Sequence, residues 1–284
     1  MTISVEEHVS TTTPLQYLAA DTFAGRTVFV TGGGSGINLA IAKALARLGA
    51  SIAICGRSED RLQSARSELE AHDARVATYV ADVRDYAAVQ QAIDATAVDL
   101  GPIDVLICGA AGNFVAAGED LSSNGFRAVL EIDTLGSFHA VRAAFDQLRR
   151  TRGNVLFISG CQSVAPYFGQ AHIGAAKAGV DALMRSIAAE WGVYGIRANT
   201  IYPGVTEGTE GRYRVAPDET SLMAWTRSTA LGRFADSEEI AAMAAVLCSP
   251  LAAYVTGAAV TVDGGLALSG PAEVNVALRQ TTTS

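Results

Sequence analysis

Lys177 is the residue of this sequence with the clearest potential for chemistry. It lies in the segment AHIGAAKAGVDAL, residues 171–183, where the glycine and alanines at 174–176 indicate a packed helix face. The alternative is a lysine on an exposed helix surface. Ile173 lies four residues earlier, one helical turn back on the same face. The spacing therefore predicts a partly buried cation beside an apolar side chain.

His172 is a second candidate for proton transfer, because the ordinary pKa of histidine lies near neutral pH. Five helical residues separate His172 from Lys177. At about 100° per residue they lie about 140° apart around the helix axis, so we expect them on different faces. A substrate contact by His172 and a purely structural role both remain open.

The segment VFVTGGGSGINLAIAKALARLG, residues 28–49, reads as a strand, a glycine turn and a helix. This context is typical of a loop that binds a pyrophosphate. Gly32 permits the tight turn, and Gly36 opens the helix, whose first N–H groups can face an anion. The pattern TGxxxGxG ends on Asn38 in place of its last glycine, which leaves the local geometry open. A glycine turn without a ligand is the alternative.

The end of the second predicted strand indicates which cofactor binds. An NAD site places an acidic residue there, but the sequence AICGRSED has Gly56 at that position, followed by Arg57 and Ser58. Arg57 can form a forked, charge-assisted contact with a 2′-phosphate, and Ser58 can add a hydroxyl. The sequence therefore predicts NADP(H) rather than NAD(H), unless Arg57 is only a solvated residue. Asp82, at the end of the third strand, is a candidate partner for the adenine amino group.

Short apolar runs alternate with helical patterns along the chain. The predicted strands are 27–31, 51–55, 75–81, 104–108, 154–159, 197–202 and 258–263, and the predicted helices include 36–48, 59–72, 85–98, 126–150, 173–191 and 237–248. Continuous apolar runs are typical of strands covered on both faces. We predict an α/β fold with a Rossmann-type, doubly wound parallel sheet of seven strands and helices on both faces.

No linker divides the chain, so we predict a single domain. Residues 1–24 are expected to form an N-terminal arm, residues 25–268 the catalytic domain and residues 269–284 a C-terminal tail. The polar segment at about 204–228 fits a lid over the substrate.

Composition narrows the classes of partner. The 284 residues are 49% hydrophobic and 18% charged with a net charge of −8, which argues against a nucleic-acid partner. The four cysteines lack metal-ligand spacing, so we expect no metal and a reducing compartment. The sequence has no 18-residue apolar span, no apolar segment typical of a signal peptide and no SKL-type ending, so we expect no membrane partner and a cytoplasmic location.

These features resemble the short-chain dehydrogenase/reductase family. Besides the glycine loop, ICGAAGNF at 107–114 and YPG at 202–204 carry the resemblance, which covers about residues 24–268. It implies a Rossmann-type domain, a nicotinamide cofactor and usually a homotetramer. Most members have a catalytic Ser–Tyr–Lys set, of which this chain keeps only Lys177. Ile173 stands at the tyrosine position and Gly160 at the serine position.

Within that family, the chain resembles 2,4-dienoyl-CoA reductases, most closely the peroxisomal type. That type also has a histidine before an apolar residue at the tyrosine position and lacks the serine. The matching segments are AAGNF at 110–114, EIDTLGSFHAVR at 131–142, AHIGAAKAGVDAL at 171–183, GTEG at 208–211 and SPLAAYVTGAAVTVDGG at 249–265.

The resemblance implies a reaction that needs no tyrosine. Carbonyl reduction creates an alkoxide beside the nicotinamide, and a tyrosine protonates it. In a 2,4-dienoyl thioester the hydride adds at C5, and the charge moves to the distant thioester oxygen, which needs an oxyanion site and later a proton for carbon.

We therefore expect Lys177 to bind the nicotinamide ribose, and Asp133 and Lys177 together to hold the protonating water. Asp133 paired to a distant cation is the alternative. Asn113 is expected to donate to the thioester oxygen, with a turn-forming asparagine as the alternative.

The remaining expected contacts are with the cofactor and the substrate. Phe114, His172 and Ile173 are expected beside the acyl group, while Arg212 and Arg214 are expected to meet the CoA phosphates or to be ordinary solvated arginines. The cofactor residues are Gly32, Ser35, Gly36, Ile37, Arg57, Ser58, Asp82, Val83, Gly109, Ala110, Lys177, Pro203 and Gly204.

The expected function is NADPH-dependent reduction of 2,4-dienoyl-CoA thioesters to enoyl-CoA in fatty-acid β-oxidation, with a water-mediated protonation of the dienolate. One alternative is a short-chain reductase of another activated alkene or carbonyl. The other is a catalytically silent protein that binds NADP(H).

Overall fold

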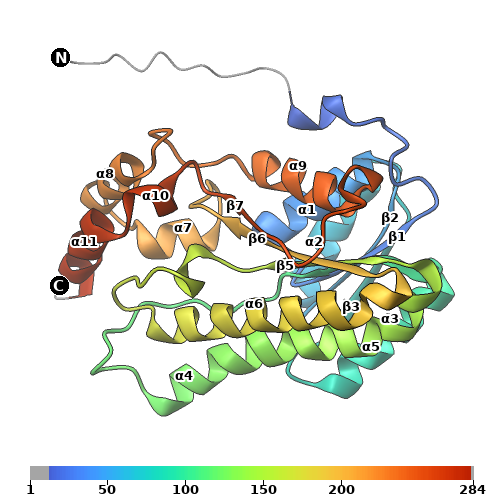
Figure 1. Ribbon diagram of the computed structural model, residues 1–284, viewed down its shortest axis with the longest axis horizontal. Coiled ribbons are helices and arrows are strands. Elements are labelled where there is room, and N and C mark those ends of the chain that lie inside the picture. The colour runs from blue at the N-terminus through green and yellow to red at the C-terminus, as the bar shows by residue number, and fades with distance from the viewer. Residues whose placement is uncertain (1–12, 283–284) are drawn as a thin grey trace.

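A seven-stranded parallel sheet forms the centre of the computed structural model, which describes residues 13–282 (Figure 1). Its strand order is β3-β2-β1-β4-β5-β6-β7, and every neighbouring pair is parallel. The strands are β1 (Thr27–Thr31), β2 (Ser51–Gly56), β3 (Val76–Val80), β4 (Ile103–Cys108), β5 (Asn154–Ile158), β6 (Arg197–Pro203) and β7 (Ala259–Val262). The predicted doubly wound, seven-stranded sheet is confirmed.

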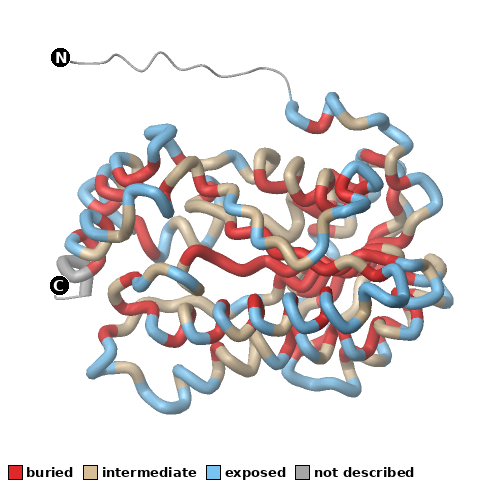
Figure 2. Tube along the Cα trace, in the orientation of Figure 1, coloured by how far each residue is buried: buried red, intermediate tan, exposed pale blue. Residues whose placement is uncertain are grey.

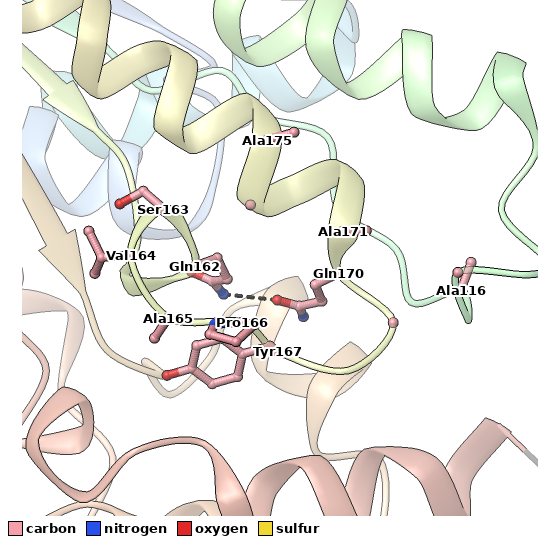
Figure 3. A pocket seen from close by; sticks show the side chains of 13 residues that line it. Ala116, Gln162, Ser163, Val164, Ala165, Pro166, Tyr167, Gln170, Ala171 and Ala175 are labelled. Atoms are coloured by element: carbon pink, nitrogen blue, oxygen red, sulfur yellow. Dashed lines mark hydrogen bonds between the residues drawn. The ribbon is translucent and has the colours of Figure 1, made fainter.

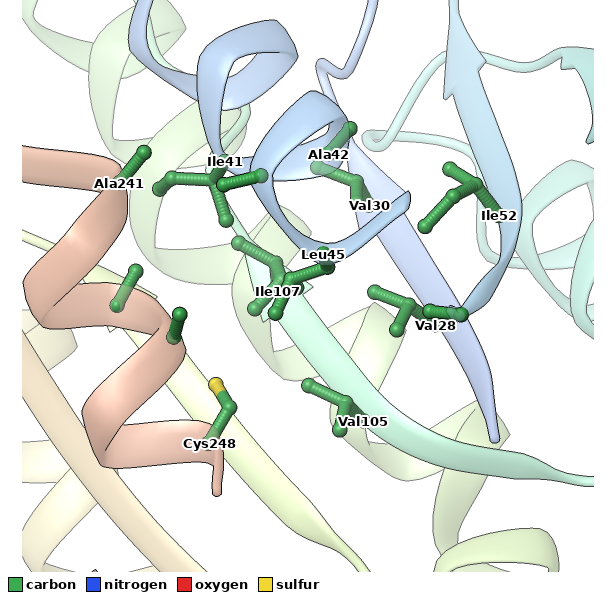
Figure 4. Packing of buried hydrophobic residues seen from close by; sticks show 14 of the residues in the cluster. Val28, Val30, Ile41, Ala42, Leu45, Ile52, Val105, Ile107, Ala241 and Cys248 are labelled. Atoms are coloured by element: carbon green, nitrogen blue, oxygen red, sulfur yellow. The ribbon is translucent and has the colours of Figure 1, made fainter. Parts of the chain in front are cut away.

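Helices cover both faces of the sheet, as predicted. One layer consists of α1 (Gly36–Arg47), α2 (Glu59–Glu70) and α9 (Ser237–Cys248). Figure 4 shows how its side chains pack, with Ile41 and Leu45 of α1 facing Val28, Val30 and Ile107 of the sheet. The opposite layer consists of α3 (Tyr86–Asp99), α5 (Gly136–Thr151) and α6 (Ala171–Trp191).

The central strands have no exposed face. Every residue of β1 and β5 is buried, and Figure 2 shows the buried band running through the middle of the molecule. Because successive side chains point to opposite faces, both faces must be apolar, which explains the continuous apolar runs in the sequence. The strand order reverses at β1 and β4, and a crevice opens beyond their carboxyl ends.

The predicted helix 126–150 is three consecutive segments in the structure: α4 (Ser123–Leu130), a π turn η2 (Glu131–Leu135) and α5. The helix begins earlier than predicted because Ser122 Oγ accepts a hydrogen bond from Gly125 N and caps it. The other predicted boundaries differ from the observed ones by no more than one or two residues. Short 3-10 turns connect several elements: η1 (Pro14–Tyr17), η3 (Cys161–Ser163), η4 (Gly192–Tyr194) and η5 (Pro250–Ala252).

Both ends of the described chain belong to the packed domain more fully than predicted. Leu15 and Phe23, within the predicted arm, are buried in the core beside α1 and α9, whereas residues 1–12 lie outside the described part. The predicted tail contains α11 (Ala272–Thr282), preceded by α10 (Leu266–Ser269). Val274 and Leu278 of α11 are fully buried, so the description of this segment as a tail is wrong.

The predicted lid contains α7 (Glu210–Val215) and α8 (Glu219–Ser228). Trp225 of α8 and Val215 of α7 share an apolar cluster with Val274 and Leu278, so α11 packs on the lid. Between residues 13 and 282, none of the helices combines the length and the apolar character that a membrane crossing requires.

Candidate active site

A cleft of about 1070 Å³ lies beyond the carboxyl ends of the strands and contains most of the predicted site residues. Those that line it are Gly32, Ser35, Gly36, Ile37, Arg57, Ser58, Asp82, Val83, Gly109, Ala110, Asn113, Ile173, Lys177, Pro203 and Arg214. Gly204 instead lines a smaller adjoining cavity, where the lid approaches the sheet.

Lys177 lines this cleft and forms a buried ion pair with Asp133, which does not itself line it. Lys177 Nζ lies 3.0 Å from Asp133 Oδ2 and donates to Ile158 O at 3.0 Å. The two residues are 8% and 1% exposed, so the lysine is not a surface residue. The predicted juxtaposition of these side chains is therefore present.

The π turn explains how Asp133 reaches Lys177. Thr134 Oγ1 donates to Ala176 O at 2.9 Å, which holds the turn against α6. Asp133 Oδ1 accepts from Gly112 N at 2.7 Å, which connects the turn to the loop after β4. A π turn often marks a functional site because it redirects one side chain out of the helical register. Here it directs a carboxylate inward.

The two positions at which the family resemblance predicts Ser and Tyr contribute no hydroxyl. Ile173 is 3% exposed and packs with Val129 and Ala176 beside the cleft. A Cβ atom added to Gly160 would lie 2.4 Å from Gln162 Oε1, so the glutamine side chain occupies the space beside this glycine. The sequence prediction missed Gln162, which no motif singles out.

The glycine loop fits a pyrophosphate. Gly32 and Gly36 have φ values of 67° and 58°, which favour glycine, and Ser35 makes no side-chain cap to α1. The first N–H groups of α1 therefore face the cleft without an intrahelical partner and can bind a phosphate.

Asn38, which replaces the last glycine of the motif, joins two loops. Its Nδ2 donates to Gly32 O at 3.2 Å and to Gly109 O at 2.8 Å. A Cβ atom at Gly109 would lie 2.1 Å from Asn38 Oδ1, so the asparagine requires a glycine there. The departure at residue 38 thus preserves the loop and fixes it to the end of β4.

Cations are present where the sequence predicts a site for the 2′-phosphate of NADP(H). Arg57 is exposed, lines the cleft and forms no ion pair with any residue that the structure describes. Ser58 Oγ accepts from Arg61 N at 3.4 Å and caps α2. Arg61 also lines the cleft, where its Nη2 lies 2.9 Å from Glu210 Oε1 of the lid helix α7.

The carboxylate of Asp82 is held by a neighbour rather than left free. Hydrogen bonds from Arg84, which lies 2.6 Å away, lower the pKa of Asp82. An adenine contact by Asp82 stays a prediction and would have to share its oxygens with Arg84.

The structure corrects the expected substrate contact of His172. Its side chain is fully buried, does not line the cleft and packs on Phe114, with ring centroids 4.1 Å apart. Burial lowers the pKa of His172, which favours the neutral ring. Phe114 itself packs against the cluster around Ile173 and is absent from the lining of the cleft, so its predicted substrate contact would be indirect.

The two lid arginines are used differently. Arg214 lines the cleft, donates to Asn113 O and pairs with Glu210 Oε2 at 3.2 Å. Arg212 does not line the cleft itself, and its guanidinium lies over the rings of Tyr213 and Phe234. Its side chain is 17% exposed and lines the small cavity under the lid, and its contact with CoA phosphates stays a prediction.

Cys161, close to the site, is a neutral thiol. Burial raises its pKa to about 12, and its Sγ donates to Asp263 Oδ2 at 3.5 Å. Cys161 is therefore a packing residue rather than a nucleophile.

The fold and the cleft define a nicotinamide-dependent oxidoreductase, and comparisons with known proteins identify its family. A family model described as Enoyl-(Acyl carrier protein) reductase matches residues 32–267. The chain belongs to the short-chain dehydrogenase/reductase family.

Within the family, the chain is similar to 2,4-dienoyl-CoA reductases. The peroxisomal, (3E)-enoyl-CoA-producing enzyme of Saccharomyces cerevisiae is 40% identical over 253 residues, which cover 87% of this chain and 85% of the relative. The probable, (2E)-enoyl-CoA-producing enzyme of Bacillus subtilis is 38% identical over 245 residues, which cover 84% and 96%. The resemblance seen in the sequence is confirmed.

A solved structure that shares the fold is bound to NADPH. It is an NADPH-bound short chain oxidoreductase from Pseudomonas aeruginosa PAO1, described as containing an atypical catalytic center. It is 31% identical to this chain, with a TM-score of 0.80 and coverage of 86% of this chain and 98% of the other.

Proposed function

We propose that this protein reduces 2,4-dienoyl-CoA thioesters to enoyl-CoA with NADPH. The observation that carries the proposal is the buried Lys177–Asp133 pair, whose lysine lines the cleft together with apolar Ile173 and Gly160. Such a site retains a cation and a carboxylate but lacks the hydroxyl that a carbonyl reductase uses. The similarity to 2,4-dienoyl-CoA reductases supports the same activity.

The cleft residues divide into two groups in this proposal. The N–H groups at the start of α1 and the guanidinium of Arg57 would hold the phosphates of the cofactor, and Lys177 would bind its nicotinamide ribose. When bound, the reduced nicotinamide supplies a hydride to C5 of the diene. Ile173 excludes water from this region because it is buried and apolar.

The remaining residues stabilise the developing negative charge and supply the proton. As electron density moves through the conjugated system to the thioester oxygen, the side-chain amide of Asn113 donates a hydrogen bond to it. Asp133 accepts, and Lys177 donates, hydrogen bonds to a water that protonates the dienolate carbon. His172 takes no part, because its ring lies outside the cleft lining.

One assay tests the activity. Purified protein is mixed with NADPH and 2,4-hexadienoyl-CoA while the absorbance of both cofactor and diene is followed. Loss of both signals together supports the proposal. If the protein does not reduce this substrate but reduces acetoacetyl-CoA or a quinone, the proposed activity would be replaced by another short-chain reductase activity. Tight NADPH binding without turnover of any of these would indicate a silent cofactor-binding protein.

The cofactor preference rests on Arg57. We expect Arg57→Ala to lower kcat/KM for NADPH by about 10- to 100-fold, since a hydrogen bond to a charged group contributes about 1.5–3 kcal/mol, and to leave use of NADH nearly unchanged. Arg66→Ala, on the helix α2 that follows Arg57 but paired with Glu70 and outside the cleft, is the control. Equal use of NADPH and NADH by the unmodified protein would refute the preference.

We further propose a homotetramer in the cytoplasm. Phe126 on α4, Leu135 in the π turn and Phe138 on α5 are 37%, 42% and 45% exposed, and neighbouring exposed apolar side chains favour a subunit contact. The four cysteines are free thiols, which suits a reducing compartment. Sedimentation equilibrium tests the tetramer, and cell fractionation tests the location.

A further inference from the structure

Gln162 occupies a junction in the active site that the proposed roles leave unexplained. It lines the cofactor cleft and also two cavities next to it. One of these cavities, about 410 Å³, lies between the loop after β5 and the first turns of α6 (Figure 3). The other, about 140 Å³, lies under the lid and is also lined by Asn113.

The side chain of Gln162 takes the place of a serine. A Cβ atom on Gly160 would lie 2.4 Å from Gln162 Oε1, so the carboxamide lies over Gly160, where a serine side chain would project. The backbone at this point is fixed, because a Cβ on Gly174 of α6 would lie 2.9 Å from Gln162 O. Gly160, Gly174 and Gln162 therefore form one arrangement that presents an amide to the cleft.

Gln170 forms a hydrogen bond with this amide. Figure 3 shows the two glutamine side chains pointing toward each other, with Gln162 Nε2 donating to Gln170 Oε1 at 3.0 Å. Gln170 is 2% exposed, and its own Nε2 is buried without a hydrogen-bond partner. A buried donor without a partner is unfavourable, and such groups need an explanation.

A half-turn of both carboxamide groups about their terminal bonds gives the buried Gln170 Nε2 a hydrogen-bond partner. Each carboxamide has a donor end and an acceptor end, so the bond between them survives the rotation. Gln170 Nε2 then donates to Gln162 Oε1, and Gln162 Nε2 faces the space over Gly160. In this state the cleft gains an N–H donor where relatives with a complete Ser–Tyr–Lys set have a hydroxyl.

We infer that Gln162 donates a hydrogen bond to the thioester oxygen of the substrate, with Asn113 as the second donor and Gln170 as a positioning residue. This inference rests on the proposed function. The thioester oxygen lies several bonds from C5 of the diene, so its donor must reach farther from the nicotinamide than a serine hydroxyl does. A glutamine side chain has that reach, and the glycine at 160 leaves room for it. A neutral amide also suits a partner that gains negative charge, since no counter-charge has to be buried with it.

The test measures the hydrogen bond directly. Full-length protein with NADP⁺ binds 2,4-hexadienoyl-CoA labelled with carbon-13 at the thioester carbonyl, and infrared difference spectra report its stretching frequency. The oxidised cofactor prevents turnover. We expect a lower carbonyl frequency in the wild type than in Gln162→Leu, and a broadened, intermediate band in Gln170→Leu. Equal frequencies in the wild type and Gln162→Leu would overturn the inference, and so would absence of thioester binding.

Steady-state kinetics separate this inference from the proposed function. With NADPH, Gln162→Leu should lower kcat about 100-fold with little change in KM, as expected for a donor that acts mainly in the transition state. Gln91→Leu, the same change at an exposed position of α3, should leave both constants unchanged. If the wild type lacks dienoyl-CoA reductase activity, the proposed function fails. If the wild type is active and Gln162→Leu equals it in rate and carbonyl frequency, only the role of Gln162 fails.

A second variant keeps the test independent of folding. Gln162→Glu preserves the size of the side chain, but the ionised group accepts and does not donate hydrogen bonds. It should raise the carbonyl frequency and lower kcat at least as much as Gln162→Leu does, with an unchanged circular dichroism spectrum. Retention of the wild-type frequency and rate in this variant would also overturn the inference.

Discussion

Lys177 Nζ lies 3.0 Å from Asp133 Oδ2, and both side chains are buried, with Lys177 lining the cleft. Each partner is also tied to the backbone, Lys177 to Ile158 O and Asp133 to Gly112 N. The pair therefore joins β5, α6, the π turn and the loop after β4 around one point. A charge pair that connects four segments serves both stability and chemistry, and the two contributions need separate measurements.

The variant Asp133→Asn should separate the contribution of this ion pair to stability from its contribution to catalysis. The variant keeps an acceptor for Gly112 N but leaves the Lys177 ammonium without a counter-charge, and breaking a buried pair costs about 3–5 kcal/mol. We expect a lower free energy of unfolding in urea and, at a temperature where the variant is folded, a kcat at least about 100-fold lower. Lys177→Ala should abolish activity. Wild-type kcat in folded Asp133→Asn would contradict the proposed water-mediated protonation.

The buried imidazole of His172 predicts a pH dependence of stability. Burial lowers its pKa below the usual 6.5, so the unfolded chain takes up a proton at a higher pH than the native protein does. Because the unfolded state then binds more protons, stability falls as the pH drops below about 6.5 and continues to fall down to the lowered native pKa.

His172→Phe isolates this contribution, since phenylalanine keeps a ring against Phe114 and does not titrate. Between about pH 8 and about pH 5, the variant should lose less unfolding free energy than the wild type does. His72, whose pKa is also lowered, is present in both proteins and cancels in the difference. Parallel stability curves would show that His172 is not held neutral.

Asn38 and Gly109 form an interdependent pair, because the asparagine amide fills the space beside the glycine. Gly109→Ala alone should destabilise the protein by about 1–3 kcal/mol, as expected for overpacking. Asn38→Gly alone loses two hydrogen bonds of about 0.5–1.5 kcal/mol each. The double variant should be more stable than the sum of the two losses predicts, as measured by urea denaturation. Additivity within about 0.5 kcal/mol would contradict the coupling.

The sequence predicts the sheet well because its signals are local. The buried strands are short apolar runs, and the turn at Gly32 and the helix start at Gly36 are encoded by adjacent residues. Lys177 and Ile173 could be placed on one helix face from their spacing alone. The spacing of Val274, Ala277 and Leu278 is also typical of an amphipathic helix, so the sequence carries a signal for α11 as well.

The parts that sequence patterns do not reveal depend on contacts between distant segments. The inward position of Asp133 requires a π turn, which has no sequence signature and is stabilised by α6 through Thr134. His172 of α6 packs against Phe114, a residue of the loop after β4, and this contact contributes to its burial. The position of Gln162 depends on the absence of a side chain at Gly160, so its meaning becomes visible only when both residues are placed.

The C-terminal helix predicts a selective effect on substrate binding. Asn275 Oδ1 accepts from Phe168 N at 2.8 Å, and Val274 packs in the cluster with Trp225 of the lid. The same loop contributes Pro166, Tyr167 and Gly169 to the 410 Å³ cavity beside the cleft. The helix α11 therefore supports one wall of that cavity and the lid, and between Ala272 and Leu278 none of its residues lines the cofactor cleft.

Asn275→Ala should therefore raise KM for the dienoyl-CoA by about two- to tenfold, because it removes a hydrogen bond that contributes about 0.5–1.5 kcal/mol. The Kd for NADPH should stay unchanged. Val276→Ala, a change at a 59% exposed position of the same helix, is the matched control. Truncation after Ser269 should raise KM further, because it also uncovers Trp225. A KM for Asn275→Ala equal to that of the control, or a parallel weakening of NADPH binding, would show that α11 does not act through the substrate cavity.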